Sequence, residues 1–301
     1  MVEIREILCP TDFSEPSRHA LDHAMVIAKW YGSRITALHV IHVPLVPAPP
    51  PSVLIAGVAG ATMTVTSTFQ VCEEDVRAWI EPARRAGIRT DVSVDEGNAA
   101  RRILEHARSR TTDLIVLGTH GLSGADRAML GSVTEKVLRK ASCPVLTVPP
   151  TLETAAKVPY KRLLCPVDFS ESSLKALQHA LSLAEEADAS LTILHVFDWP
   201  RDGDLLVERF DTQEFRRVIE EDARERLEGL VSNEARQWCN PSTTVAYGKP
   251  YREILELAAR EEIDLIVMGV RGRNPLDLTL FGSTTNHVVR RASCPVLTLR
   301  E

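Results

Sequence analysis

The chain contains two copies of one sequence unit, and this repeat constrains the fold more than any other feature. The stretch ILCPTDFSEPS at 7–17 returns as LLCPVDFSESS at 163–173, 156 residues later. The stretch ASCPVLT at 141–147 returns unchanged at 292–298, 151 residues later. The halves are therefore two copies of one unit, and we expect both to fold in the same way.

The length of the chain suits two domains. With 301 residues it is long for one compact domain, whereas each half is large enough to bury a core of its own. We expect one domain at 1–150 and a second at 158–301. The two would be joined by a linker between Pro149 and Tyr160.

Each unit alternates strand patterns with helix patterns. In the second half, Ser170 stands at a helix N-cap position, and Leu174, Leu177 and Leu181 follow at helical spacing. The run DLIVMG at 264–269 has the length of a strand and is apolar almost throughout. The full order is β-α-β-α-β-α-β-α-β. It predicts an α/β fold in each half, with a parallel sheet covered by helices on both faces.

Composition and charge exclude several classes of protein. The chain is 44% hydrophobic and 25% charged, and its formal net charge of −6 gives no basic surface for nucleic acid. The N-terminal MVEIREILCPTDF lacks the long apolar core of a signal peptide. The six cysteines show no metal-binding spacing and are expected to be free buried thiols. We expect a cytoplasmic protein that binds neither nucleic acid nor membranes.

One stretch departs from this average composition. No charged residue occurs from Val43 to Cys72, where the first copy also holds nine extra residues. Prolines open the stretch, and Gly, Ser and Thr dilute its apolar run, so a transmembrane helix is not expected. The sequence favours a mobile or partner-covered loop at 43–72. Its role is left open between a lid, a contact with a second chain and a disordered loop.

Each half also carries a loop with the glycine spacing Gly-x2-Gly-x9-Gly-Ser, at 118–132 and 269–283. Ligands of open parallel sheets sit beyond the carboxyl ends of the strands, which is where these loops lie. The first two glycines would let the backbone turn tightly and approach a ligand without Cβ clashes. The last Gly-Ser pair opens a helix whose free N–H groups attract an anion. The spacing therefore predicts a phosphate cradle.

Further candidate residues follow the first two strands of each half. Asp12 and Asp168 come directly after the first strand, and Val40 and Val196 close the second. The aspartates are either turn formers beside a helix N-cap or acceptors of hydrogen bonds from a base or ribose. The residue pattern leaves both roles open.

These motifs together resemble the universal stress protein family in its tandem two-domain form. The resemblance rests on the glycine spacing after DLIVLG, on the aspartate of CPTDFS and on the terminal CPVLTV. It covers nearly the whole chain. It implies two tandem Rossmann-like domains of the adenine nucleotide alpha hydrolase type, each with a five-stranded sheet. The glycine motif marks the ATP-binding branch of the family, so the resemblance also implies ATP, with or without Mg, as the cofactor.

The resemblance places a set of nucleotide-binding residues in each half. In the first half they are Pro10, Thr11, Asp12, Val40, Gly118, His120, Gly121, Gly131, Ser132 and Val133. In the second half they are Pro166, Val167, Asp168, Val196, Gly269, Arg271, Gly272, Gly282, Ser283 and Thr284. The nine residues between the second and third glycines of the motif differ between the halves, LSGADRAML at 122–130 against RNPLDLTLF at 273–281. It therefore stays open whether the two sites bind the nucleotide equally.

Four other side chains have alternative interpretations. His120 and Arg271 lie inside the glycine loops and either contact phosphate or face solvent. His23 and His179 occupy equivalent positions in the first helix of each half. Surface or packing roles are expected for this pair.

The last strands predict how the halves assemble. The resemblance implies that this edge is a dimerisation edge, so SCPVLTV at 142–148 and SCPVLTL at 293–299 are expected to pair within one chain. Such pairing would remove two exposed sheet edges. One tandem chain would then be a built-in dimer, and two chains would form a homodimer with four domains.

Catalytic motifs are missing from the sequence. It contains no G-x4-GK[ST] loop, no G-x-S-x-G elbow and no H-E-x-x-H helix. We therefore expect a nucleotide-binding, stress-response regulator without catalytic or metal-binding residues. One alternative is a slow ATPase or autophosphorylating enzyme, in which Asp12 or Asp168 positions water or metal and Ser132 or Ser283 accepts phosphate. Another is a scaffold with vestigial nucleotide sites.

Overall fold

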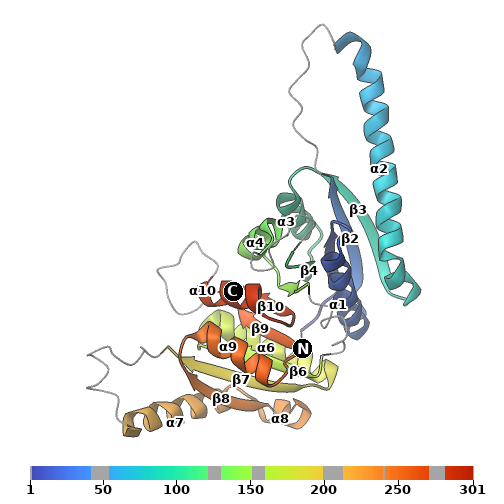
Figure 1. Cartoon of the computed structure of the whole chain (residues 1–301). Coiled ribbons are helices and arrows are strands. Elements are labelled where there is room, and N and C mark those ends of the chain that lie inside the picture. Colours follow the sequence, from blue (N-terminus) through green and yellow to red (C-terminus); the bar gives the residue numbers. More distant parts are fainter. Residues whose placement is uncertain are drawn as a thin grey trace.

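The computed structural model describes residues 2–41, 54–120, 130–150, 160–198, 213–239, 241–270 and 282–300. The first half consists of β1 (Glu6–Thr11), α1 (Glu15–Tyr31), β2 (Arg34–Ile41), α2 (Leu54–Arg85), β3 (Arg89–Glu96), α3 (Ala99–Ser109), β4 (Leu114–Gly118), α4 (Ser132–Lys140) and β5 (Val145–Val148). The second half consists of β6 (Arg162–Pro166), α6 (Glu171–Ala187), β7 (Ser190–Phe197), α7 (Gln213–Gly229), α8 (Asn233–Cys239), β8 (Ser242–Tyr247), α9 (Pro250–Arg260), β9 (Leu265–Gly269), α10 (Ser283–Arg291) and β10 (Val296–Leu299). Figure 1 shows the two halves and their elements.

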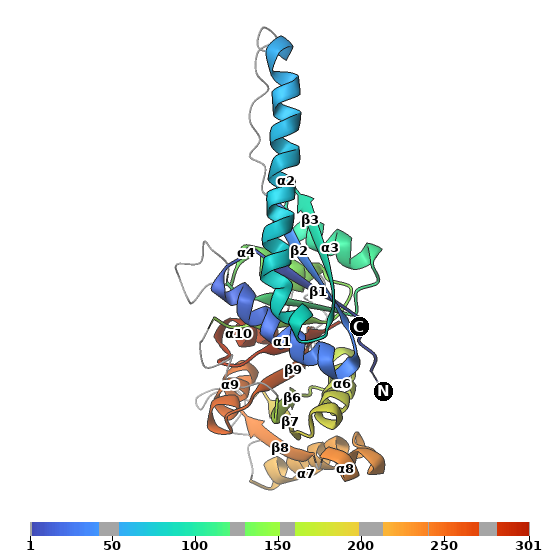
Figure 2. The same ribbon diagram turned by 90° about the vertical axis from the view of Figure 1, so that its right-hand side faces the viewer.

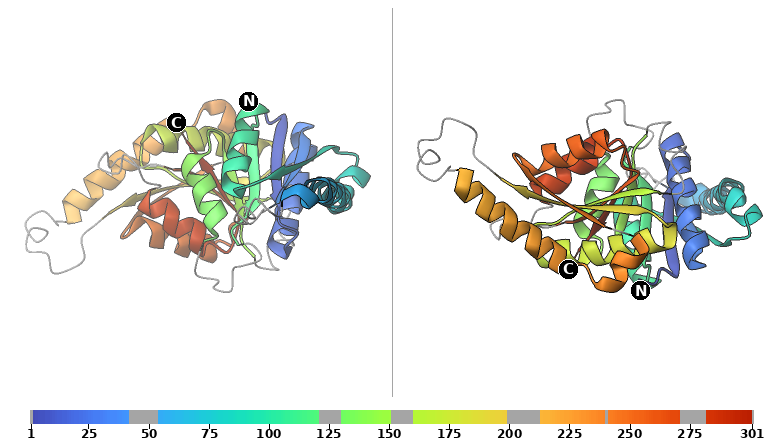
Figure 3. Two further views of the ribbon diagram at one scale, coloured as in Figure 1. Left: turned by 90° about the horizontal axis from the view of Figure 1, so that it is seen from above. Right: turned by 90° about the horizontal axis from the view of Figure 1, so that it is seen from below.

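Within the described residues, ten strands form one sheet in the order β3-β2-β1-β4-β5-β10-β9-β6-β7-β8. Strands of the same half pair in parallel, so the predicted α/β fold is confirmed in both halves. Figure 3 shows α9 and α10 on one face of the second half and α6 and α7 on the other. Apolar residues fill both interfaces between helices and sheet.

Local sequence signals explain where the first helix of each half begins. Ser14 and Ser170 have extended backbone and cap α1 and α6, each accepting a hydrogen bond from the N–H three residues later. The predicted N-cap at Ser170 is confirmed. The α1 helix ends at Gly32, whose φ of +63° favours glycine. These caps fix α1 and α6 directly behind β1 and β6.

The predicted pairing of the two last strands is also confirmed. β5 and β10 run antiparallel, and Leu146 lies opposite Leu297. Thr147 Oγ1 donates to the carbonyl of Val296 at 3.1 Å. The Thr298 hydroxyl donates in the same way across the seam, also at 3.1 Å. This seam joins the halves into one continuous sheet, whereas a homodimer of two such chains stays a prediction.

Replacing Thr147 by valine is expected to lower the free energy of unfolding by about 1 kcal/mol, because valine keeps the shape of threonine and loses the buried hydrogen bond. Urea denaturation would measure this loss. The same change at Thr298 should have the same effect, since the two hydroxyls are equivalent across the seam. An unchanged denaturation midpoint in both variants would contradict this role of the hydroxyls.

The prediction of a loop at 43–72 is wrong for its second part, because α2 begins at Leu54. Residues 42–53 lie outside the described residues. The end of α2 is anchored in the core by Val76, Trp79 and Ile80, which are buried at helical spacing. The sequence contains no proline between Pro51 and Pro82. The helix therefore continues without a break from its buried end back to Leu54. Figure 2 shows α2 extending well beyond the sheet.

Two other expectations concern the membrane and the cysteines. In the described part of the chain, no helix is both long and apolar enough to cross a bilayer. All six cysteines are free thiols, and four of them are buried as expected. Cys72 and Cys143 are half-buried instead. Burial raises the pKa of Cys143 to about 11, which keeps this thiol protonated at neutral pH.

Candidate functional site

The strand order reverses at one point in each half. β2 lies on one side of β1 and β4 on the other, and the second half repeats this arrangement with β7, β6 and β9. The register pairs Thr11 with His39 and Leu8 with Ile115, so the carboxyl ends of β1, β2 and β4 meet at one edge. Ligands of open α/β sheets bind in the crevice at such a switch point.

Asp12 and Asp168 form the turns that follow β1 and β6. The Oδ1 atom of Asp12 accepts hydrogen bonds from the Ser14 N–H at 3.1 Å and from the Ser14 hydroxyl at 2.5 Å. Asp168 accepts the equivalent bonds from Ser170 at 3.0 and 2.5 Å. The turn-forming role of both aspartates is therefore present. The same turns hold both aspartate side chains at the edge of the sheet where the carboxyl ends of the strands meet, which we call the carboxyl edge.

An aromatic pair, which the sequence motifs did not predict, lies beside each aspartate. Phe13, with φ +63°, lies 4.6 Å from His39 between ring centroids. Phe169, with φ +62°, lies 4.9 Å from His195. Each histidine Nδ1–H donates to a backbone carbonyl at the end of the neighbouring first strand, that of Thr11 at 2.9 Å in the first half and that of Val167, the residue after β6, at 2.7 Å in the second. The repetition of DFS and LHV in both halves was the signal for this pair.

The first glycine of each loop lies against the first helix of the same half. A Cβ at Gly118 would lie 2.9 Å from the Cβ of Pro16 and 3.0 Å from its carbonyl carbon and oxygen. A Cβ at Gly269 would lie 2.8 Å from the carbonyl carbon of Ser172. Both glycines are therefore required by the first helix of the same half, which packs against the end of the strand. The predicted close approach of a ligand to these glycines stays a prediction.

The second part of the glycine motif closes the loop. The Gly131 N–H donates to the Thr119 carbonyl at 2.8 Å, and the Thr134 hydroxyl donates to the last carbonyl of β4 at 2.8 Å. In the second half, Gly282 and Thr285 make the equivalent bonds at 3.0 Å each. These bonds hold the start of α4 at the end of β4, and the start of α10 at the end of β9.

This closure leaves the N-termini of α4 and α10 at the carboxyl edge. Gly131 and Gly282 occupy the N-cap positions, and neither helix receives a side-chain cap from the residues that the structure describes. Ser132 and Ser283 are exposed at the first helical position, and the residues after them are half-buried. Backbone N–H groups in the first turn of a helix, without a capping side chain, suit an anionic ligand.

His120 adds a second polar group to this edge. Its Nδ1 atom lies 2.9 Å from the Thr119 hydroxyl. Its Nε2 atom is buried and has no hydrogen-bond partner among the described residues. Buried polar atoms are normally paired, so an imidazole nitrogen in this position suits a ligand oxygen.

The remaining predicted residues have mixed positions. Pro10, Pro166, Val40 and Val196 are half-buried. Thr11 and Val167 are buried, and the Thr11 hydroxyl accepts from the Phe13 N–H at 3.0 Å, so its side chain serves the turn.

The structure does not describe three of the predicted residues. Gly121, Arg271 and Gly272 lie outside the described residues. In the described ranges, no group of three or more metal-ligating side chains occurs.

Comparison with known proteins decides the family. The model of the universal stress protein family matches residues 3–149 and again 159–300. The chain belongs to the universal stress protein family. The two matches also show the tandem two-domain form.

Several universal stress proteins are similar to this chain. A universal stress protein of Mycolicibacterium smegmatis is 28% identical over 309 aligned residues, which cover 98% of this chain and 96% of that protein. One from Methanocaldococcus jannaschii is 34% identical over 151 residues, covering 47% of this chain and 83% of that protein. The crystal structure of a universal stress protein from Archaeoglobus fulgidus matches with a TM-score of 0.68 at 24% identity, covering 98% of each chain. This last likeness shows that the two-domain fold is shared.

Proposed function

We propose that this tandem universal stress protein binds ATP at the carboxyl edge of each half and acts as a nucleotide-dependent regulator. The observation that carries the proposal is the N-terminus of α4, which begins beside the strand switch point and has no side-chain cap among the described residues. The positive end of a helix and its free N–H groups favour phosphate at this place. The same arrangement at α10 supports a second site.

Each group at the edge has a role in this proposal. The phosphates accept hydrogen bonds from the first-turn N–H groups of α4 and from the Ser132 hydroxyl. His120 donates to a phosphate oxygen through its Nε2 atom, which has no partner in the described part of the chain. Asp12 and Val40 hold the adenosine end.

ATP is expected to stabilise the folded protein. At about 100 times the dissociation constant, one bound ATP adds about 2.7 kcal/mol to the free energy of unfolding. For a protein of 301 residues, this corresponds to a rise in Tm of about 4 °C. A thermal-shift titration measures it, with adenosine as the control that lacks phosphates. A Tm that does not change with ATP would contradict the proposal.

An enzyme is the second candidate, and the exposed Ser132 favours it. This hydroxyl lies at the first position of α4, where a phosphoryl group transferred from ATP would also be stabilised. Incubation with γ-labelled ATP separates the candidates. Intact ATP retained in proportion to the sites supports a regulator, and steady phosphate release or labelled protein supports an enzyme. Failure to bind any nucleotide would leave a scaffold with vestigial sites.

A further inference from the structure

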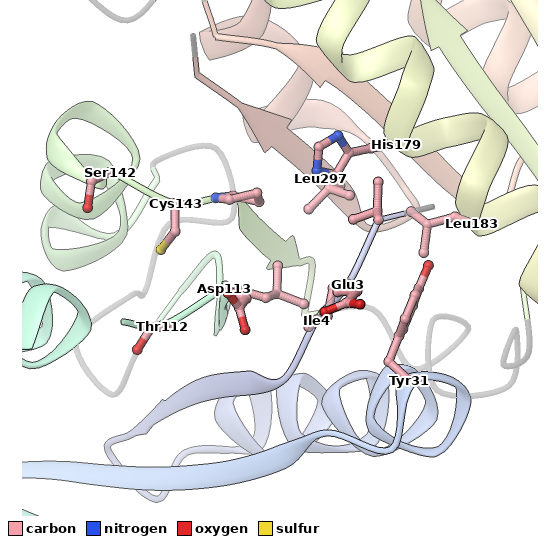
Figure 4. Close-up of a pocket in the computed structure, with 13 residues that line it drawn as sticks. Glu3, Ile4, Tyr31, Thr112, Asp113, Ser142, Cys143, His179, Leu183 and Leu297 are labelled. Atoms are coloured by element: carbon pink, nitrogen blue, oxygen red, sulfur yellow. The ribbon is translucent and has the colours of Figure 1, made fainter. Parts of the chain in front are cut away.

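A cavity of about 320 Å³ lies between the two halves, at the end of the sheet opposite the candidate nucleotide site. Ile4 and Cys143 line it from segments that precede β1 and β5, and Leu297 lines it from β10. His179 and Leu183 contribute from α6. Figure 4 shows His179 and Leu183 across the cavity from Thr112 and Cys143. The wall therefore combines apolar side chains of both halves with the imidazole of His179 and with further polar side chains, which are Glu3, Tyr31, Thr112, Asp113 and Ser142.

The internal repeat provides a second copy of this place, in which a tyrosine replaces Ile4. The spacing of 156 residues makes Tyr160 the counterpart of Ile4, and His23 the counterpart of His179. Tyr160 is completely buried, and its hydroxyl lies 2.7 Å from Nδ1 of His23. The two rings stack with centroids 5.6 Å apart at 11°. The predicted packing role of His23 is confirmed.

The surroundings of Tyr160 match the lining of the cavity. Burial raises the pKa of Tyr160, and Cys294 and Asp264 contribute to the same rise. Their counterparts, Cys143 and Asp113, both line the cavity. One side of the molecule therefore holds a phenol ring that belongs to the chain. On the other side, the smaller Ile4 leaves a space beside the equivalent cysteine, aspartate and histidine.

His179 is prepared to accept a hydrogen bond. Its Nδ1 lies 3.1 Å from the Lys175 carbonyl, and because a carbonyl only accepts, Nδ1 carries the proton and Nε2 of the neutral ring is an acceptor. Burial lowers the pKa of His179, which favours this neutral form. In the part of the chain that is described, no hydrogen bond reaches Nε2. A hydroxyl donor is the group that this atom would bind.

We propose that this cavity binds a small neutral phenol, with the ring against Ile4, Leu183 and Leu297 and the hydroxyl donating to His179. The volume is sufficient, since an apolar cavity of about 150 Å³ already binds benzene. The apolar side chains of the wall match the ring, and His179 offers a neutral acceptor for the hydroxyl, whereas the Asp113 and Glu3 carboxylates in the same wall already accept hydrogen bonds from Arg5. Because this site lies at the other end of the sheet, the proposal does not depend on nucleotide binding.

The probe for this site is p-cresol, which has the structure of a tyrosine side chain. Titration of the full chain by isothermal calorimetry should show saturable binding of one p-cresol, with a dissociation constant of about 1 mM or lower. The variant Ile4→Tyr should lose this binding, because its own ring fills the cavity as Tyr160 does in the other half. Failure of the full chain to bind, or equal binding by Ile4→Tyr, would overturn the proposal.

Two further variants keep the test independent of how well Ile4→Tyr folds. His179→Leu should weaken p-cresol binding by about tenfold and leave toluene binding unchanged, since only the hydroxyl contact is lost. Tyr160→Ala should bind a second p-cresol and gain more in Tm from it than the unmodified chain does. Equal weakening of both probes in His179→Leu would show that the histidine accepts no hydrogen bond and would overturn this assignment.

Discussion

Replacing Ser132 by aspartate is expected to lower the affinity of the first half for ATP by at least about 100-fold. A carboxylate about 4 Å from a phosphate costs about 4 kcal/mol at an effective dielectric constant of 20, before screening by salt. The same carboxylate favours the fold, since a negative charge in the first turn of α4 stabilises the helix by about 0.3–1 kcal/mol. The variant should therefore bind ATP more weakly and yet be slightly more stable, so a loss of binding cannot be mistaken for a loss of folding.

Asparagine at position 132 is the matched control, because it has the size of aspartate without its charge. Ser132→Asn should bind ATP within about threefold of the unmodified protein, a difference below about 1 kcal/mol. Calorimetric titration of ATP and urea denaturation measure the two effects. Ser283→Asp tests the second half in the same way. If the aspartate and asparagine variants bind ATP equally well, the phosphates do not lie at this helix N-terminus.

Replacing Gly118 by alanine is expected to lower the free energy of unfolding by about 2–3 kcal/mol. The new Cβ would lie within 3.0 Å of three atoms of Pro16, two of them in its backbone. Because α1 is packed on the sheet, it cannot withdraw without opening the core beneath it. Thermal and urea denaturation of the purified variant measure this loss.

Gly229 supplies the control for this prediction. It lies at the end of α7, and a Cβ there would meet no atom within 4 Å. Alanine at this position should raise the free energy of unfolding by about 0.5–1 kcal/mol. Gly269→Ala should repeat the loss seen with Gly118→Ala, because Ser172 blocks it in the same way. A Gly118→Ala variant as stable as the unmodified chain would show that α1 moves freely from this position.

Much of the fold could be predicted from the repeat and from hydrophobic periodicity. Apolar runs such as DLIVMG are buried on both faces of the sheet, and only parallel strands between two helix layers bury both faces in this way. The pairing of β5 with β10 was predictable because two copies of one edge strand cover each other. Ser170 was predictable because an N-cap signal lies within a few residues of its helix.

The parts that were missed depend on contacts between distant segments. The packing requirement at Gly118 was not predicted because its contact with Pro16 involves residues about 100 positions apart, which spacing does not reveal. The first part of α2 was assigned to a loop because no amphipathic pattern marks it. At the cavity, Ile4 stands where the other copy has Tyr160. The consequence of this difference is visible only in the structure, where Tyr160 contacts α1 and Ile4 faces α6 across the cavity.

The most direct test of the nucleotide proposal is equilibrium dialysis of labelled ATP against the full chain and against the double variant Ser132→Asp, Ser283→Asp. The unmodified chain should bind ATP saturably, and the double variant should bind none at the same concentrations. The double asparagine variant should bind as the unmodified chain does. ATP binding that persists undiminished in the double aspartate variant, or is absent from the unmodified chain, would contradict an ATP site at the N-termini of α4 and α10.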